Sequence, residues 1–321
     1  MTKQNSSSSL STAERVGLEV DDINAAAAVK TIVAAEAAGV KQIWMGQSPF
    51  WPDTLTTLAA AATKTSTIRL GTSIVPTYPR HPLVMAQQAL SLYDIAPGRL
   101  RLGIGPSHRA IIEDIYGLPQ PAPLAHLREY VSVLRAALWE GKVDHHGKFF
   151  NVKVSLSHTA QVPVLISTLG VKAFQLAGEI ADGALSSVCP IQYLLRTGIP
   201  ALRTAAVANG RSAPPLVANV SVVLSQDRDS IIAAGRQSLD ILAKLPFYAK
   251  MFADAGFPLT TGQMIPESLI DSLIVSGNED KVAAQFTELL AAGLDELMVK
   301  LVSIKDAVDE FTRLMNLIGQ L

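Results

Sequence analysis

Short apolar runs alternate with helix-like segments along the whole chain. The strand-like runs cover about residues 15–20, 42–45, 69–75, 100–104, 164–167, 184–188, 216–224 and 296–301. A segment with helical spacing follows each run, most clearly at 125–140, where Leu127, Val131, Leu134 and Leu138 share one face. Eight strand–helix units predict an α/β fold of the (β/α)8 TIM-barrel type.

Two stretches break this rhythm, at about 141–160 and 246–275. The first alternates like a hairpin, and the second is irregular, with prolines at 246, 258 and 266. A barrel needs about 250 residues, so these insertions account for the excess. A doubly wound sheet is the rival fold, but it would need a domain boundary, and the composition shows no linker. We therefore expect a disordered tail over 1–12 and a single barrel domain over 13–321.

Several polar residues precede the expected helices. Asp21 or Asp22, Asp53 and Asp229 are predicted to cap the helices that follow them. His81 and Pro82 are typical of a capping residue and a first-turn proline, which is a simpler interpretation than a catalytic histidine.

Charge and cysteine content exclude several classes of function. The chain carries 27 basic and 28 acidic residues in scattered positions, so nothing indicates nucleic acid or an anionic membrane as partner. No secretory h-region and no apolar run of about 18 residues is present, which predicts a cytoplasmic protein. The one cysteine, Cys189, is expected to be a small buried side chain. His145 and His146 lack a third ligand nearby, so no metal site is predicted.

Small residues stand at the expected carboxyl ends of several strands, where barrel enzymes place their chemistry. Gly103 and Gly105 follow the fourth strand, Ser167 to Gly170 the fifth, and Ser186 and Ser187 the sixth. His108 stands where a dinucleotide-binding motif needs its third glycine, so that motif is not predicted. The 167–170 turn either holds a phosphate at a helix N-terminus or is an ordinary βα loop.

Three further side chains are candidates for chemistry at the same end. His108 can give or take a proton near neutral pH, or is a plain surface-loop residue. Trp51 is either a lid over the barrel mouth or part of a ligand wall. Lys300 fits a pairing with a rim carboxylate better than a Schiff-base role.

Three motifs, in this order and spacing, resemble the bacterial-luciferase-like flavin and deazaflavin oxidoreductases. They are Arg69-Leu-Gly-Thr, Arg80-His-Pro and Gly98-Arg-Leu-Arg-Leu-Gly-Ile-Gly105. The closer resemblance is to the branch that uses coenzyme F420, which includes methylenetetrahydromethanopterin reductase and F420-dependent dehydrogenases, and it runs from about residue 15 to 300.

The resemblance implies a site for coenzyme F420, with FMN as the alternative cofactor, in the C-terminal mouth of the barrel. It implies a non-proline cis peptide bond between Ser73 and Ile74, behind the cofactor ring. The residues it assigns to cofactor binding are Gly46, Ser73, Ile74, Gly103, Gly105, Ser167, Thr168, Leu169, Gly170 and Ser187. A homodimer is also implied, through alanine-rich and Met85-Ala-Gln-Gln faces of the second and third helices.

Two departures from the sugar-dehydrogenase relatives change the expected chemistry. Gly46-Gln47 replaces their Asp-His pair, and His108 replaces a glutamate. Since alcohol oxidation needs a base, we expect instead a reductase that transfers hydride from reduced F420 to an activated C=C or C=N bond of a small molecule. His108 is the predicted proton donor, with Gln47 and Trp51 as further catalytic candidates. The alternatives are an FMN-dependent, O2-using monooxygenase and a non-catalytic cofactor-binding barrel.

Overall fold

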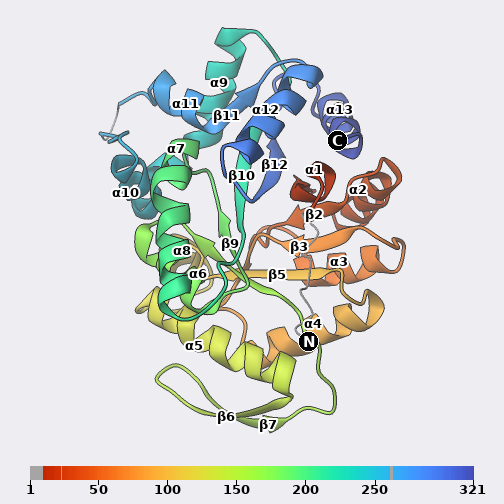
Figure 1. The fold of residues 1–321 in the computed structure, drawn as a ribbon, viewed down its shortest axis with the longest axis vertical. Coiled ribbons are helices and arrows are strands. Elements are labelled where there is room, and N and C mark those ends of the chain that lie inside the picture. The colour runs from red at the N-terminus through yellow and green to blue at the C-terminus, as the bar shows by residue number, and fades with distance from the viewer. Residues whose placement is uncertain (1–9, 23, 261–262) are drawn as a thin grey trace, which may run out of the picture.

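Eight parallel strands close into a barrel in the computed structural model, which describes residues 10–22, 24–260 and 263–321. They pair in the order β1, β2, β3, β5, β8, β9, β10 and β12, and β12 pairs with β1 to close the ring (Figure 1). Their bounds are β1 (Val16–Glu19), β2 (Gln42–Met45), β3 (Arg69–Thr72), β5 (Leu100–Gly105), β8 (Val164–Thr168), β9 (Gly183–Ser186), β10 (Leu216–Val223) and β12 (Glu296–Leu301). The predicted TIM barrel is confirmed.

Helices surround the barrel on its outside (Figure 1). The longer ones are α2 (Ala25–Ala37), α3 (Thr54–Ala62), α4 (Pro82–Ile95), α5 (Pro123–Arg135), α6 (Val171–Ile180), α8 (Ile199–Ala208), α9 (Arg228–Leu239), α12 (Glu279–Ala291) and α13 (Ala307–Gly319). Short elements include α1 (Thr12–Arg15), α7 (Ile191–Tyr193), β4 (Val75–Pro76), π-helical turns at Ala110–Ile115, Ala136–Glu140 and Leu194–Gly198, and a 3-10 turn at Leu242–Lys244.

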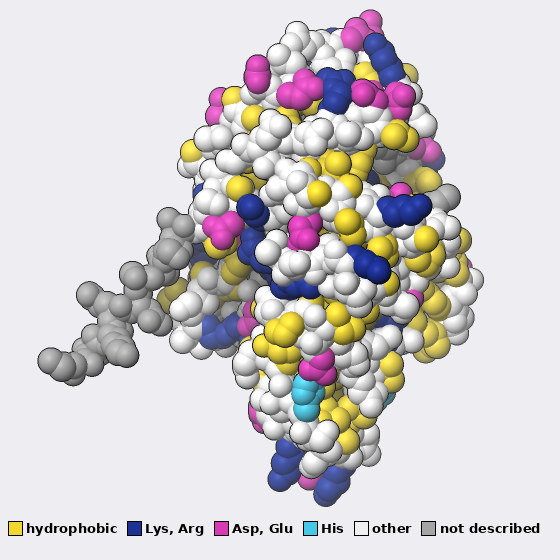
Figure 2. Space-filling model, turned by 90° about the vertical axis from the view of Figure 1, so that its right-hand side faces the viewer, with side chains coloured by type: hydrophobic (Ala, Val, Ile, Leu, Met, Phe, Trp, Pro, Cys, Tyr) yellow, Lys and Arg dark blue, Asp and Glu magenta, His cyan; other side chains and the backbone are white. Residues whose placement is uncertain are grey.

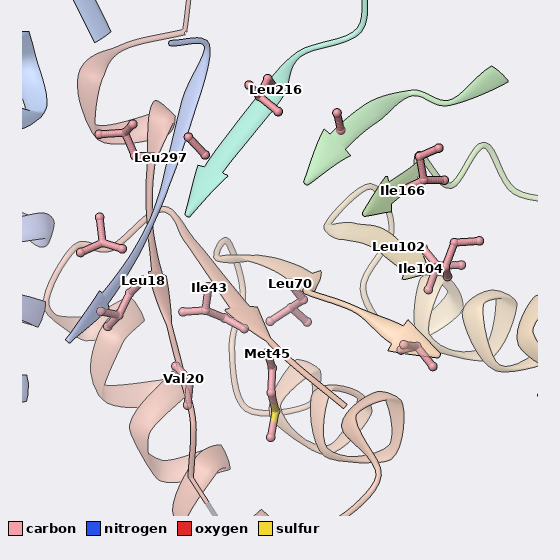
Figure 3. Close-up of a cluster of buried hydrophobic side chains, with 14 of the residues drawn as sticks. Leu18, Val20, Ile43, Met45, Leu70, Leu102, Ile104, Ile166, Leu216 and Leu297 are labelled. Carbon is pink, nitrogen blue, oxygen red and sulfur yellow. The ribbon is translucent and has the colours of Figure 1, made fainter. Parts of the chain in front are cut away.

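The main core lies between the strands and the helices. Strand side chains that alternate outward are fully or almost fully buried there, and Figure 3 shows Leu18, Ile43, Leu70 and Leu102 on successive strands. This layer explains why the strands read as nearly continuous apolar runs, since both of their faces are covered.

A second, smaller core fills the inside of the barrel. It consists of Trp44, Leu165, Leu185, Val217 and Met298, with Ile74 packed against it. The indole of Trp44 takes the space of two missing side chains, because a Cβ at Gly71 would lie 2.2 Å from its Cε3 and one at Gly17 would lie 2.8 Å from its Nε1. These side chains, called the apolar plug below, fill the inside of the barrel beneath the carboxyl ends of the strands.

Both insertions take a defined form. Residues 141–160 contain the antiparallel hairpin of β6 (Lys142–His146) and β7 (Asn151–Ser155), as predicted. Residues 246–275 are less irregular than expected, because they form α10 (Pro246–Asp254), α11 (Glu267–Leu273) and the start of β11 (Ile274–Ser276). β11 adds to the sheet beside β10.

Two of the predicted helix caps are wrong. Asn24, rather than Asp21 or Asp22, caps α2 by accepting from the amides of Ala26 and Ala27 at 2.9 and 3.1 Å. Asp227, rather than Asp229, caps α9. The sequence does not distinguish these aspartates from the true N-caps, which lie two or more residues away. Which residue caps a helix depends on where the backbone enters the helical conformation, and that point is uncertain by one or two residues.

The other predicted caps are confirmed. Asp53 caps α3, and His81 caps α4 with Pro82 in the first turn. The expected disordered tail falls outside the described residues over 1–9. Ser11 and Thr12 differ from that expectation, because Ser11 forms a capping box with Glu14 and Thr12 begins α1.

The surface adds two observations. Figure 2 shows charged side chains of both signs scattered among uncharged ones on the face it displays. Among the described residues, no helix has the length and hydropathy to cross a bilayer. The homodimer stays a prediction, but Met85 and Ala86, proposed for its interface, are fully buried within the subunit.

Candidate active site

Strand register places two layers of inward-pointing residues above the apolar plug. Side chains alternate along each strand, and neighbouring strands are staggered, so each layer takes one residue from every second strand. The pairings define an upper layer of Glu19, Ser73, Ser167 and Asn219. The rim layer one step closer to the C-terminal mouth is Gly46, Gly105, Ser187 and Lys300.

These two layers divide the mouth into chemically different halves. The side formed by β2, β3, β5, β8 and β9 carries only glycine and serine, whereas the side formed by β10, β12 and β1 carries Asn219, Lys300 and Glu19. A flat ligand can approach the backbone on the first side. On the second side, Glu19 and Lys300 can transfer protons and form ionic contacts with a ligand.

Glu19 is the centre of the charged half. One carboxylate oxygen accepts from Asn219 Nδ2 at 2.7 Å, and the other lies 3.1 Å from Lys300 Nζ, which also pairs with Asp21. Burial raises the pKa of Glu19 to about 7, against the lowering effects of Lys300 and Asn219. Glu19 therefore changes protonation near neutral pH.

The small-residue half is tightly built around Gly105. A Cβ there would lie 2.1 Å from Ser167 Oγ and 3.4 Å from Ile74 Cδ1, so Gly105, Ser167 and Ile74 meet at one point of the rim. The peptide bond between Ser73 and Ile74 is cis, as predicted. Three residues assigned separately from the sequence are thus brought together.

Several polar side-chain atoms at this end are buried and have no hydrogen-bond partner among the described residues. Thr77 Oγ1 and Ser186 Oγ are two of them, and the three that belong to or border the two layers are Ser73 Oγ, His108 Nδ1 and Asn219 Oδ1. A buried polar group without a partner costs about 1–3 kcal/mol, so such atoms indicate a ligand that completes them. The positions of these three after β3, after β5 and within β10 distribute the contacts around the mouth.

His108 lies beside the second insertion. Its ring centroid is 5.6 Å from that of Tyr248 on α10, and the Tyr248 hydroxyl donates to Ser187 Oγ at 3.0 Å. Burial lowers the pKa of His108, which favours the neutral imidazole at pH 7. The sequence prediction missed Tyr248, because nothing in the pattern of 246–275 fixed which side chain would point to the strand ends.

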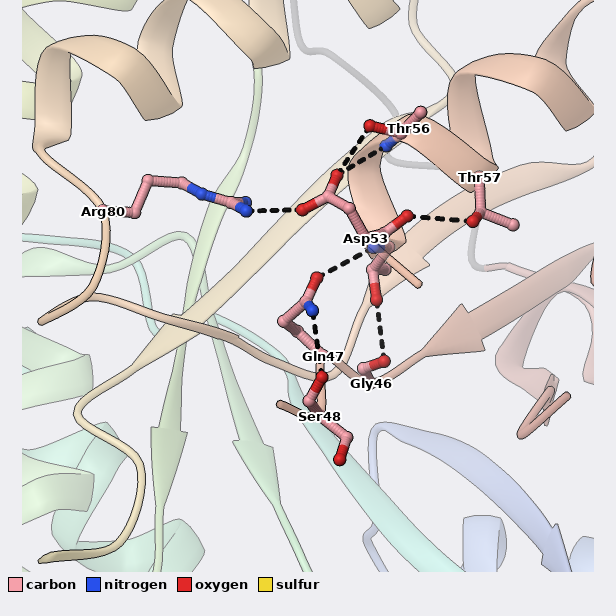
Figure 4. A network of polar contacts seen from close by, with 8 residues as sticks. Gly46, Gln47, Ser48, Asp53, Thr56, Thr57 and Arg80 are labelled. Atoms are coloured by element: carbon pink, nitrogen blue, oxygen red, sulfur yellow. Dashed lines mark hydrogen bonds and ion pairs between the residues drawn. The ribbon is translucent and has the colours of Figure 1, made fainter. Parts of the chain in front are cut away.

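Several predicted site residues make hydrogen bonds or packing contacts within the protein. The Gln47 side chain accepts from the Thr54 amide at 2.8 Å and donates to the Ser48 carbonyl at 3.2 Å (Figure 4). The Thr168 hydroxyl donates to the Leu185 carbonyl at 3.3 Å. Gly103 lies below the upper layer, where a Cβ would be 2.0 Å from the Thr72 carbonyl oxygen, so it belongs to the plug rather than to the ring edge.

The start of α6 keeps free amides, as one of the two interpretations of that turn requires. Gly170 is the N-cap residue, no side chain caps the helix, and a Cβ at Gly170 would meet open space. The Leu169 carbonyl accepts from Tyr193. Trp51 is half-buried in the loop between β2 and α3.

Glu19 and Asn219 were also missed, although a signal was present. Lys300 was predicted to pair with a rim carboxylate, and that pairing is confirmed. Because the first and last strands of a barrel are neighbours, the carboxylates at the end of the first strand were the natural partners. Cys189 is buried as predicted, and burial raises its pKa to about 12, so it is no nucleophile.

Comparison with known proteins identifies the family. The family model described as luciferase-like monooxygenase matches residues 3–296, and the chain belongs to this family of oxidoreductases. It is 27% identical over 287 residues to a 5,10-methylenetetrahydromethanopterin reductase of Methanolobus tindarius, covering 82% of this chain and 86% of the relative. It is 28% identical over 286 residues to an F420-dependent glucose-6-phosphate dehydrogenase of Kineococcus radiotolerans, covering 83% and 84%.

Solved structures show the same fold. The coenzyme F420-dependent tetrahydromethanopterin reductase of Methanopyrus kandleri superposes with a TM-score of 0.76 at 23% identity, over 95% of this chain and 97% of that one. The oxygenating constituent of 3,6-diketocamphane monooxygenase from Pseudomonas putida, in complex with FMN, gives 0.75 at 18% identity, over 96% and 97%. The fold is thus shared by proteins with either cofactor.

Proposed function

We propose that this protein is an F420-dependent reductase that adds hydride and a proton across an activated C=C or C=N bond of a small organic molecule. The division of the strand-end layers into a glycine–serine half and a proton-carrying half is the observation that carries the proposal. The names of its sequence relatives support F420 as the cofactor. Gly46-Gln47, where the sugar dehydrogenases that it resembles carry an Asp-His pair, favours reduction over alcohol oxidation.

The residues present fit a deazaflavin. Gly46, Gly105 and Ser167 give the side of the mouth that a flat ring would approach small residues only, and Ser73 Oγ is a buried polar atom that lacks a partner among the described residues. The free amides of α6 and the Ser187 hydroxyl suit an anionic group on the cofactor side chain. When bound in its reduced form, the cofactor supplies the hydride.

The chain supplies the proton from the opposite half of the mouth. An acid is most effective when its pKa lies near the working pH, and Glu19 meets this condition with a pKa of about 7. Asn219 and Lys300 hold its carboxylate in place. His108, the donor predicted from the sequence, is favoured as a neutral imidazole, which can hydrogen-bond the substrate through a ring N–H.

An FMN-dependent monooxygenase is the second candidate, because the matching family model is described as luciferase-like monooxygenase and the similar 3,6-diketocamphane monooxygenase constituent was solved in complex with FMN. A non-catalytic barrel is the third. Fluorescence titration of the purified protein with F420 and with FMN separates these functions. Tighter binding of F420, followed by oxidation of reduced F420 in the presence of activated alkenes or imines, supports the reductase. Preferential FMN binding with oxygen consumption supports the monooxygenase, and failure to bind either cofactor rejects both.

A further inference from the structure

Tyr248 is a buried tyrosine that the proposed chemistry does not use. It lies on α10 within the second insertion and is only 3% exposed. Its hydroxyl donates to Ser187 Oγ at 3.0 Å, and its ring faces the imidazole of His108. One side chain thus joins the insertion to a rim-layer serine after β9 and to the histidine after β5.

The direction of this hydrogen bond matters for Ser187. A serine hydroxyl has one proton to donate and two lone pairs to accept with. Tyr248 occupies one lone pair, which leaves the Ser187 proton free to point elsewhere. Ser187 is exposed, and its neighbour in the barrel, β8, leads directly into the uncapped start of α6.

Chained hydroxyls also strengthen one another. A hydroxyl that accepts a hydrogen bond becomes a better donor, and donation to an anion is stronger than donation to a neutral group. A chain from the Tyr248 hydroxyl through the Ser187 hydroxyl to an anionic oxygen therefore gains affinity only while α10 is in place. The packing of α10 and the binding of an anion by Ser187 then stabilise each other.

We infer that Tyr248 is a positioning residue that orients the Ser187 hydroxyl toward the anionic side chain of the cofactor and so couples the seating of α10 to cofactor binding. This inference rests on the proposed function. A purely structural role for Tyr248 predicts a different result. If Tyr248 orients Ser187, the affinity for the phosphate-bearing cofactor depends on the tyrosine hydroxyl, whereas the affinity for the phosphate-free chromophore does not.

The test compares two ligands in five proteins, one of which is a control. Dissociation constants are measured by fluorescence for F420 and for its phosphate-free deazaflavin chromophore, with wild type, Tyr248→Phe, Ser187→Ala and the double variant. Tyr130→Phe is the matched control, since it also removes one buried tyrosine hydroxyl, but one bonded to the Arg80 carbonyl away from Ser187. Hydrogen exchange at 246–254 is followed with and without F420.

Tyr248→Phe and Ser187→Ala should each weaken F420 binding about 10- to 150-fold, the range for a hydrogen bond that ends on a charge. The chromophore should bind all variants equally. The double variant should be no weaker than Ser187→Ala, and F420 should slow exchange in α10 only when both hydroxyls are present. Equal losses for both ligands, or single effects that multiply, would overturn the inference while leaving the proposed function intact. A wild type that binds neither ligand overturns the proposed function and this inference with it.

Discussion

The carboxylate of Glu19 lies 3.1 Å from the ammonium nitrogen of Lys300, although 281 residues separate the two in the chain. Closure of the barrel makes this contact, because Glu19 ends the first strand and Lys300 lies near the end of the last. The pair gives the mouth a group that titrates near neutral pH, held by a cation and an amide. Both the stability and the turnover of the protein should therefore depend on the protonation of Glu19.

Stability should fall as pH rises from about 4.5 to about 7 through Glu19. Its pKa is raised from 4.5 in the unfolded chain to about 7 in the folded protein, so the folded state binds the proton more tightly. The stabilising contribution is complete below pH 4.5 and is lost as pH passes through 7, with an upper limit of about 3 kcal/mol. Urea unfolding across this range should show the fall in wild type and a smaller fall in Glu19→Gln.

The comparison needs a control glutamate outside the mouth. Glu288 is exposed on α12, and Glu288→Gln should leave the pH dependence as in wild type. If wild type and Glu19→Gln keep a constant difference in unfolding free energy from pH 4.5 to 7, folding does not raise the pKa of Glu19 and its assignment as the acid is wrong.

The pH dependence of turnover should identify the proton source. With Glu19 as the acid, the rate falls as pH rises through about 7, and Glu19→Gln lowers the rate by about 10²–10⁴-fold. With His108 as the acid, the fall occurs below pH 6.5, because burial lowers the pKa of this imidazole. We expect His108→Ala to reduce the rate but to retain the transition near pH 7. A fall below pH 6.5 that disappears in His108→Ala, with Glu19→Gln unaffected, would return the role to His108.

The fold followed from the sequence because its signals are local and repeated. Each apolar strand and each amphipathic helix such as 125–140 can be recognised within its own segment. The wrong predictions concern helix caps, where neighbouring residues are equally suitable, and the irregular insertion. Asp22 accepts from Thr31 rather than capping α2, and the irregular 246–275 pattern concealed α10.

The candidate site was predictable mainly in its small-residue half, and in the charged half only the pairing of Lys300 with a carboxylate was predicted. Gly105 and Ser187 were marked by their type and by their place at strand ends, Gly46 was assigned only through the family resemblance, and the structure puts all three in one layer. The charged half depends on contacts between the first and last strands, and the Tyr248 contact depends on how an insertion folds back. No short window of sequence contains those long-range contacts.

Gln47 should matter more for stability than for chemistry. Its side-chain oxygen accepts from the first amide of α3, a role like that of a capping residue (Figure 4). Gln47→Ala should lower the unfolding free energy by about 1 kcal/mol. Gln47→Glu keeps an accepting oxygen at the positive end of the helix but loses the donation to the Ser48 carbonyl, so it should retain part of that stability.

The matching kinetic measurement decides whether Gln47 is catalytic. Turnover by both variants should fall far less than the roughly 10²–10⁴-fold that a positioned acid or base contributes. A loss of that size in folded Gln47→Glu would instead show that the amide contacts the reactants.

Gly105→Ala should damage cofactor binding through the space it occupies. The new Cβ would lie 2.1 Å from Ser167 Oγ and 3.0 Å from Ser167 Cβ, so Ser167 has to shift. Overpacking of this kind costs about 1–3 kcal/mol of stability. We also expect F420 to bind at least about tenfold more weakly, since the methyl group enters the face where the flat ring approaches the backbone.

The double variant Gly105→Ala with Ser167→Gly separates these two effects. Removing the Ser167 side chain relieves both close contacts, so the unfolding free energy should recover by most of what Gly105→Ala loses. The methyl group still stands in the mouth, so F420 affinity should remain low, whereas Ser167→Gly alone should bind F420 more tightly than the double variant. Recovery of both stability and affinity in the double variant would mean that Gly105 serves packing alone and that the ring lies elsewhere.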